Sequence, residues 1–264
     1  MMKKVLILGA GLVSKPMVEY LLNEGFQVIV ATRTVEKAQK LIGGHKNGKA
    51  IAWVMEDKET LSDMVRDCDL AVSLLPYRFH VDVAKLCLKH KKHLVTTSYI
   101  SPAMQALHDD AVKTGVIFLN EVGLDPGIDH MSAMRVIDHV KQKGGHIEEF
   151  YSLCGALPAP EDANNPFGYK FSWSPRGVLL AGKNSALYLH DGGEVFIPGD
   201  ELFRHRWDVP VDIEGTTATL EGYPNRNSLP YATTYGIEGV SDMFRGTLRN
   251  RGWCQIMSKV LELG

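Results

Sequence analysis

The chain has little of what marks secreted, membrane-spanning or nucleic-acid-binding proteins. Its 264 residues contain four cysteines and no C-x-x-C pair, so we expect reduced thiols and a cytoplasmic location rather than a disulfide framework or a zinc site. No apolar run approaches the length needed to cross a bilayer, and the apolar stretch after Met1–Lys4 is too short for a signal peptide. The formal charge of −2 gives no reason to expect nucleic acid or an anionic membrane as a partner.

The histidines also show no pattern that predicts a metal site. His90 and His93 lie among lysines, which is typical of a solvated surface. His130 follows Asp129 at a predicted helix start, but no second ligand is evident beside it. We therefore expect no metal.

Strands and helices alternate along residues 5–120, a pattern typical of a parallel sheet with helices on both faces. The hydrophobic fraction of 45% and the charged fraction of 23% are ordinary for a globular protein, and the length allows two domains. We predict an α/β fold with a Rossmann-type, doubly wound parallel sheet over residues 1–124. Residues 125–264 are predicted to form a second, mixed α+β domain for substrate binding and dimerisation, with a largely antiparallel sheet. Its predicted elements include the strands Phe150–Gly155, Val178–Leu180 and Ala186–Leu189 and a last helix over Gln255–Leu263.

The most informative stretch is the glycine turn after the first predicted strand, Val5–Leu8. Gly9-Ala10-Gly11-Leu12-Val13-Ser14 leads into a predicted helix over Lys15–Asn23 and then into a second apolar strand. Strand, glycine turn, helix and strand in this order predict a dinucleotide-binding unit. Gly9 permits the tight exit from the strand, and Gly11 lets backbone N–H groups approach a pyrophosphate at the helix N-terminus. Ser14 at the third small position is a mild departure from Gly or Ala.

The end of the second strand distinguishes between two cofactors. No Asp or Glu occurs between Phe26 and Val35, where an NAD-preferring site has an acidic residue that accepts hydrogen bonds from the ribose hydroxyls. Arg33 stands there instead, followed by Thr34, and its planar fork of donors suits a 2′-phosphate. We therefore predict NADP, with NAD the less favoured cofactor. The alternative is that Arg33 is an ordinary solvated arginine.

Ligands of a doubly wound sheet collect beyond the carboxyl ends of its strands, and further loops, including residues 96–99 and 120–127, reach that edge. Ser98 and Tyr99 bring hydroxyl groups there. Asp125 precedes a predicted helix, so the sequence allows a helix cap, a role in substrate binding or proton transfer, or both together. The candidate cofactor contacts in these loops and the glycine turn are Gly9, Ala10, Gly11, Leu12, Val13, Arg33, Thr34, Leu75, Thr97, Ser98, Leu124 and Pro126.

Several long and unusual segments carry a family resemblance. They are Ser73–Tyr77, Thr97–Ala103, Gly123–His130, Leu157–Glu161, Tyr169–Ser174, Tyr223–Arg226 and Arg245–Arg249. With them, and along essentially its whole length, the chain resembles the glutamate-forming saccharopine dehydrogenases, also called saccharopine reductases. The resemblance implies an NADP-dependent oxidoreductase of lysine metabolism. Hydride transfer to or from an imine would interconvert saccharopine with L-glutamate and α-aminoadipate semialdehyde, which are the implied small-molecule substrates.

The resemblance also implies a carboxylate that transfers protons and cationic side chains that hold the carboxylates of the substrate. The candidate catalytic residues are Asp125, Tyr99 and Cys154, although a small buried thiol is an equally good interpretation of Cys154. Arg226 is the best candidate for a bidentate carboxylate contact. Arg245 is more doubtful, because neighbouring arginines often divide between ligand contacts and structural ion pairs. The candidate substrate contacts are Ser98, Tyr99, Arg226, Thr247, Leu248 and Arg249.

The chain departs from the family pattern at Ser14, and at Val54 and Met55, where an acidic residue tends to follow the third strand. It also stops at Gly264, before the later helical and return segments of the family, so we expect a C-terminally truncated chain. Two alternatives follow: a catalytically incomplete NADP-binding fragment, and a related imine reductase such as a carboxynorspermidine synthase. We further expect a cytoplasmic homodimer.

Overall fold

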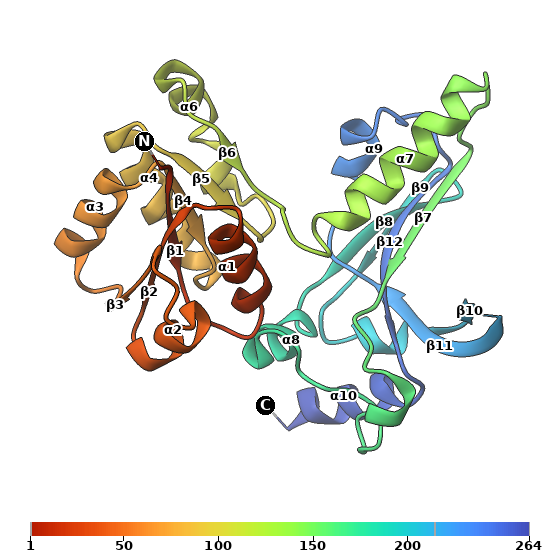
Figure 1. Ribbon diagram of the computed structural model, residues 1–264. Helices are drawn as coiled ribbons and strands as arrows, with labels where there is room; N and C mark the ends of the chain where they lie inside the picture. The colour runs from red at the N-terminus through yellow and green to blue at the C-terminus, as the bar shows by residue number, and fades with distance from the viewer. Residues whose placement is uncertain (1, 214, 264) are drawn as a thin grey trace. The chain divides into compact units, whose positions relative to one another are not determined.

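The chain forms two compact units, Met1–Ile128 and Asp129–Gly264, where the sequence predicts a boundary after residue 124. The computed structural model describes residues 2–213 and 215–263 (Figure 1). Three residues lie outside the described ones: Met1, Glu214 and Gly264. The expected truncation falls on the last of them.

The first unit is a doubly wound parallel sheet. Its strands lie in the order β3-β2-β1-β4-β5-β6, and each neighbouring pair is parallel. This is the strand order of a dinucleotide-binding Rossmann fold, which confirms the predicted fold class. The strands are β1 (Lys4–Leu8), β2 (Gln27–Thr32), β3 (Gly48–Ala52), β4 (Leu70–Ser73), β5 (His93–Thr96) and β6 (Phe118–Leu119). The helices are α1 (Ser14–Asn23), α2 (Val35–Ile42), α3 (Lys58–Asp67), α4 (His80–His90), α5 (Pro102–Gln105) and α6 (His108–Thr114), with a 3-10 turn at Tyr77–Phe79.

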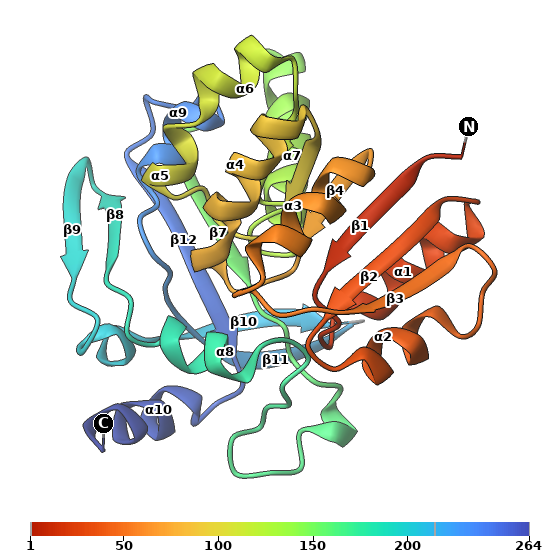
Figure 2. The same ribbon diagram turned by 90° about the vertical axis from the view of Figure 1, so that its left-hand side faces the viewer.

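Both faces of this sheet are buried, which explains why β1 is a continuous apolar run. Ile7 packs with Val18 of α1, whereas its neighbour Leu6 packs with Leu61 of α3 and Val83 of α4. Alternate residues of one strand therefore enter two different cores. The helices that cover the sheet can be followed in Figure 2.

The second unit is built on a sheet that is largely antiparallel, as predicted. Its strands lie in the order β10-β11-β12-β8-β9, and β7 pairs with β12 in parallel. The strands are β7 (Glu149–Cys154), β8 (Ala186–His190), β9 (Gly193–Ile197), β10 (Trp207–Ile213), β11 (Thr216–Pro224) and β12 (Asp242–Arg249). The helices are α7 (Ile128–Gln142), α8 (Pro175–Ala181), α9 (Pro230–Thr234) and α10 (Trp253–Glu262), with 3-10 turns at Pro160–Asp162 and Leu202–Arg204.

Helix α7 covers one face of this second sheet (Figure 1). Ala133 and Ile137 of the helix share a core with Phe150 of β7 and Met243 of β12. Because side chains alternate along a strand, every second residue of β12 after Met243 lies on the face covered by α7. This alternation decides which candidate substrate residues lie together.

One predicted element is wrong: Val178–Leu180, expected as a strand, lies inside helix α8. The Ser174 hydroxyl accepts a hydrogen bond from the Gly177 N–H at 3.1 Å, and Pro175 occupies the first turn, where the missing N–H of proline leaves no bond unmade. A short apolar run does not distinguish a strand from a buried helix segment. The Ser-Pro pair before it is the better indicator.

Candidate functional site

The glycine turn of the first unit forms a concave run of backbone groups at the start of α1. Gly9 leaves β1 with φ of 115°, and a Cβ at Gly9 would meet the Leu74 carbonyl oxygen at 3.2 Å. A Cβ at Gly11 would meet nothing within 4 Å. Val13 at the N-cap supplies no side-chain hydrogen bond. The Ser14 N–H donates to the Gly11 carbonyl at 3.3 Å and Pro16 has no N–H, so in the first turn of α1 the Lys15 N–H is the donor available to an anion.

Ser14 closes this turn. Its hydroxyl accepts a hydrogen bond from the Gly11 N–H at 3.0 Å, and the residue is fully buried. The departure from Gly or Ala at this position therefore keeps the close packing of helix and strand. Of the remaining turn residues, Ala10 is half-buried, and Leu12 and Val13 are exposed.

Arg33 and Thr34 follow β2, and both are exposed. Among the described residues, the Arg33 side chain makes no hydrogen bond or ion pair. Its planar set of donors is therefore available to an anionic group at the carboxyl end of β2.

The two candidate catalytic residues of the first unit are in direct contact. The Tyr99 hydroxyl donates a hydrogen bond to Asp125 Oδ1 at 2.6 Å, and both residues are half-buried. Asp125 lies in a tight turn in which the Gly123 N–H donates to the Pro126 carbonyl at 2.8 Å. Gly127 is required there, because a Cβ on it would lie 2.1 Å from the Gly123 carbonyl oxygen. The turn therefore holds the Asp125 carboxylate at a defined position beside Tyr99.

The other loop candidates lie at the same edge of the first sheet. Backbone hydrogen bonds join the loop of Asp125 to the end of β5 and the loop after it. The Val122 N–H donates to the Thr96 carbonyl at 3.1 Å, and the Glu121 N–H donates to the Ser98 carbonyl at 3.2 Å. Leu75, Thr97 and Ser98 are half-buried, Leu124 is exposed, and Pro126 is buried.

In the second unit, three candidate residues share one face of the sheet. Cys154 pairs with Thr247 in the β7–β12 register. By alternation, Thr247 and Arg249 lie on the same face as Arg245, whereas the Leu248 side chain lies on the opposite one. Cys154 is half-buried at the end of β7. The candidate thiol, hydroxyl and guanidinium are therefore neighbours at one end of the sheet.

Arg249 is a buried cation that forms no ion pair with a carboxylate among the described residues, although Glu221 lies opposite it in the β11–β12 register. The residue is 8% exposed, and its guanidinium lies over the rings of Tyr169 and Trp253, at 5.1 Å and 5.5 Å from the centroids. One of its N–H groups donates to the Leu248 carbonyl at 2.7 Å, but its Nε has no partner in the described part of the chain. The Glu221 carboxylate instead accepts hydrogen bonds from the Gly252 and Cys254 N–H groups, at 3.0 Å and 2.8 Å. A buried charge without a direct ion pair is costly. This arrangement is therefore suited to an anion.

Arg245, by contrast, is part of a structural ion pair. Its guanidinium donates to the Asp129 carboxylate at 2.6 Å, and the two side chains are 2% and 5% exposed. The Tyr231 ring lies 4.3 Å from the guanidinium carbon. Arg245 therefore belongs to a structural ion pair, whereas Arg249 makes none with a carboxylate in the described part of the chain. The remaining candidate, Arg226, is exposed in the loop after β11 with φ of 56°.

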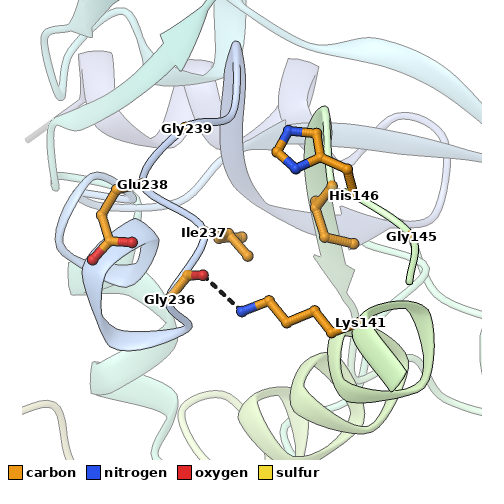
Figure 3. A pocket seen from close by; sticks show the side chains of 8 residues that line it. Lys141, Gly145, His146, Gly236, Ile237, Glu238 and Gly239 are labelled. Atoms are coloured by element: carbon orange, nitrogen blue, oxygen red, sulfur yellow. Dashed lines mark hydrogen bonds between the residues drawn. The ribbon is translucent and has the colours of Figure 1, made fainter. Parts of the chain in front are cut away.

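Two other polar groups of the second unit contain none of the candidates. The first lines a cavity of about 170 Å³ near the end of α7, where the Lys141 ammonium donates to the Gly236 carbonyl at 2.7 Å (Figure 3). The second surrounds the buried Asp242 carboxylate, whose Oδ1 lies 2.6 Å from both the Tyr151 hydroxyl and His190 Nδ1. These hydrogen bonds lower the pKa of Asp242 to about 2. We interpret both groups as structural networks.

Sequence reasoning missed one buried group of the first unit, the His80 ring. It lies between the hydroxyls of Ser73 and Ser98, at 2.9 Å from each. No motif marks this histidine, because its partners come from separate strands of the sheet.

Comparisons with known proteins agree with this arrangement. The family model described as "Saccharopine dehydrogenase NADP binding domain" matches residues 5–119, and "Saccharopine dehydrogenase C-terminal domain" matches residues 123–264. The chain belongs to the saccharopine dehydrogenase family. The predicted family is thereby confirmed, and so is NADP as the cofactor of its first domain.

Members of this family are similar along the whole chain. The chain is 44% identical to saccharopine dehydrogenase (NADP(+), L-glutamate-forming) of Pyricularia oryzae, over 99% of this chain and 58% of that protein. It is also 44% identical to the protein of the same name in Schizosaccharomyces pombe, over 100% of this chain and 58% of that protein. The solved structure of apo saccharopine dehydrogenase (L-Glu forming) from Saccharomyces cerevisiae matches with a TM-score of 0.86 and 41% identity, over 99% of this chain and 58% of that one. The chain thus spans 58% of the length of these relatives.

Within residues 2–213 and 215–263, no helix is both long enough and apolar enough to cross a membrane.

Proposed function

We propose that the chain is an NADP-dependent oxidoreductase that interconverts saccharopine with L-glutamate and α-aminoadipate semialdehyde in lysine metabolism. The observation that carries this proposal is the 44% identity, over almost the whole chain, to proteins named saccharopine dehydrogenase (NADP(+), L-glutamate-forming). The side chains of each unit add support from chemistry.

The residues of the first unit fit NADP. The open space at Gly11 admits a pyrophosphate close to the backbone, and the exposed Arg33 offers its donors to a 2′-phosphate. When bound, the cofactor supplies or accepts the hydride. The turn residues then orient it, because backbone N–H groups define the position of the phosphates.

Imine formation and imine hydrolysis both require a group that takes up and returns protons. The Asp125 carboxylate has the chemistry for this step. Its hydrogen bond from the Tyr99 hydroxyl at 2.6 Å fixes its orientation, and the rigid turn limits its movement. We assign proton transfer to Asp125 and its positioning to Tyr99, with Cys154 as a further candidate in the second unit.

The proposed substrates carry several carboxylates, which need cationic partners. Arg249 is already desolvated and lies over two neighbouring aromatic rings, so a substrate carboxylate would supply the direct ion pair that it does not make among the described residues. Thr247 and Cys154 lie on the same face of the sheet. We assign Arg249 as a carboxylate contact, and we keep Arg226, Thr247, Leu248, Ser98 and Tyr99 as further candidate contacts.

A direct assay tests the proposal. NADPH oxidation is followed at increasing L-glutamate with α-aminoadipate semialdehyde, alongside an NADPH titration in the absence of substrate. We expect oxidation that requires both substrates and is reversed by saccharopine with NADP. NADPH binding without oxidation would favour an incomplete cofactor-binding fragment, and oxidation with a different amine would favour a related imine reductase.

Arg33→Ala is expected to raise the KM for NADPH about 10- to 100-fold, as the loss of charge-assisted hydrogen bonds to a phosphate predicts. The KM for NADH should change little, because NADH has no 2′-phosphate. Steady-state kinetics with both cofactors give the comparison. Arg135→Ala, at an exposed arginine of α7, is the matched control. An equal rise in the KM for both cofactors would mean that Arg33 does not contact the 2′-phosphate.

We also propose a homodimer in the cytoplasm. The second sheet exposes aromatic side chains, including Tyr151 and Phe196, at 51% and 61%, and apolar surface of this kind favours association. The thiols of Cys68 and Cys87 are buried, and burial raises their pKa values to about 11 and about 12. Such thiols suit a reducing compartment.

A further inference from the structure

Three side chains form a hydrogen-bonded chain at the edge of the first sheet. Ser73 ends β4, His80 begins α4, and Ser98 lies in the loop after β5. His80 Nδ1 lies 2.9 Å from the Ser73 hydroxyl, and His80 Nε2 lies 2.9 Å from the Ser98 hydroxyl. The histidine ring therefore connects the interior of the sheet to a loop that carries candidate ligand contacts.

The ring is neutral under ordinary conditions. His80 is 4% exposed, and burial lowers its pKa from 6.5 to about 4. A neutral imidazole has one N–H donor and one acceptor nitrogen. One of the two serines must therefore donate to the ring, and the other must accept from it.

The burial of Ser73 decides the direction. Ser73 is fully buried, and across residues 2–213 and 215–263 its hydroxyl has one hydrogen-bond partner, His80 Nδ1. If the hydroxyl accepted from Nδ1–H, its own proton would be buried without an acceptor, which is costly. The Ser73 O–H therefore donates to Nδ1, and the ring carries its proton on Nε2. That N–H donates to Ser98 Oγ.

The consequence falls on Ser98, which is only half-buried. Its oxygen accepts from His80, so its own proton points elsewhere, and in the described part of the chain no residue accepts it. If the hydrogen bonds ran in the opposite direction, Ser98 would donate its proton to His80 and present only lone pairs to a ligand. We propose that His80 is a positioning residue that sets the Ser98 hydroxyl as a hydrogen-bond donor to an acceptor oxygen, a carboxylate or carboxamide, of a bound ligand.

The contact of Ser98 with a ligand rests on the proposed function, but the direction of the Ser73–His80–Ser98 hydrogen bonds does not. Nitrogen-15 NMR of the wild-type protein with labelled histidine reads that direction without any ligand or activity. We expect the His80 ring to show a protonated Nε2 and an unprotonated Nδ1, and the signal is assigned by its loss in His80→Gln. A protonated Nδ1 would overturn the proposal even if the enzyme is active.

A double-mutant cycle tests the positioning role. His80→Phe keeps a buried ring but removes both hydrogen bonds, and Ser98→Ala removes the donor. NADPH and saccharopine are the two probes. We expect each variant to raise the Kd or KM for one of these probes about tenfold, with kcat nearly unchanged. We expect the Kd or KM of the double variant for that probe to be no higher than that of Ser98→Ala alone, since both changes remove the same contact.

Two outcomes of this cycle would contradict the proposal. In the first, His80→Phe raises the Kd or KM as much in the Ser98→Ala variant as in the wild type. The role of His80 would then be structural and independent of Ser98. The other is wild-type affinity for both probes in Ser98→Ala. If the wild-type protein binds neither probe, the proposed function fails, and the NMR result still decides the direction of the hydrogen bonds.

Discussion

Asp125→Asn is expected to lower kcat by about a hundredfold to a thousandfold, in the range that general acid–base groups contribute. The amide keeps the size of the side chain and can still accept the hydrogen bond that Tyr99 donates to Oδ1 at 2.6 Å. What it loses is the ability to take up and return a proton. The effect should therefore appear in kcat and in the pH profile, while the Kd for NADPH changes by no more than about twofold.

Tyr99→Phe is the matched comparison for this prediction. It leaves the Asp125 carboxylate in place but removes the hydrogen bond that orients it, so we expect a smaller loss of kcat and a retained pH dependence. Stopped-flow and steady-state measurements of NADPH oxidation give both quantities. Turnover near the wild-type value in Asp125→Asn would show that Asp125 shapes the loop and transfers no proton.

The first unit could be predicted from the sequence because each of its signals is local. The apolar run Val5–Leu8 predicts a strand buried on both faces, and the glycine turn after it has one structural interpretation in that context. The second unit offered weaker signals. Val178–Leu180 lacks the length that separates a helix from a strand, and α8 forms there because Ser174 and Pro175 begin a helix.

The candidate site could be predicted only as far as residue types and spacing reach. The sequence shows Arg245 and Arg249 close together, but it does not say which of them has an ion-pair partner. That distinction depends on Asp129, which is distant in the chain and contacts Arg245 at 2.6 Å. His80 was missed for the same reason, since Ser73 and Ser98 are brought to it by two different strands.

Asp129→Ala is expected to destabilise the second unit by about 3–5 kcal/mol, the cost of leaving one partner of a buried ion pair uncompensated. The Arg245 guanidinium is 2% exposed, and its partner carboxylate lies 2.6 Å away. Removing the carboxylate leaves a cation that water does not reach and that the ring of Tyr231, at 4.3 Å, stabilises only in part. We expect the thermal midpoint of this unit to fall by roughly 10 °C, as measured by circular dichroism.

The double variant Asp129→Leu/Arg245→Met separates the loss of the charge pair from the loss of packing. Replacing both partners of a buried pair with apolar side chains is often neutral or stabilising, so we expect the double variant to recover most of the midpoint lost in Asp129→Ala. Recovery would show that the uncompensated charge, and not a cavity, causes the instability. An Asp129→Ala midpoint within about 2 °C of wild type, less than 1 kcal/mol for a unit of this size, would mean that Arg245 finds another anion or moves to solvent. The division of roles between Arg245 and Arg249 would then be wrong.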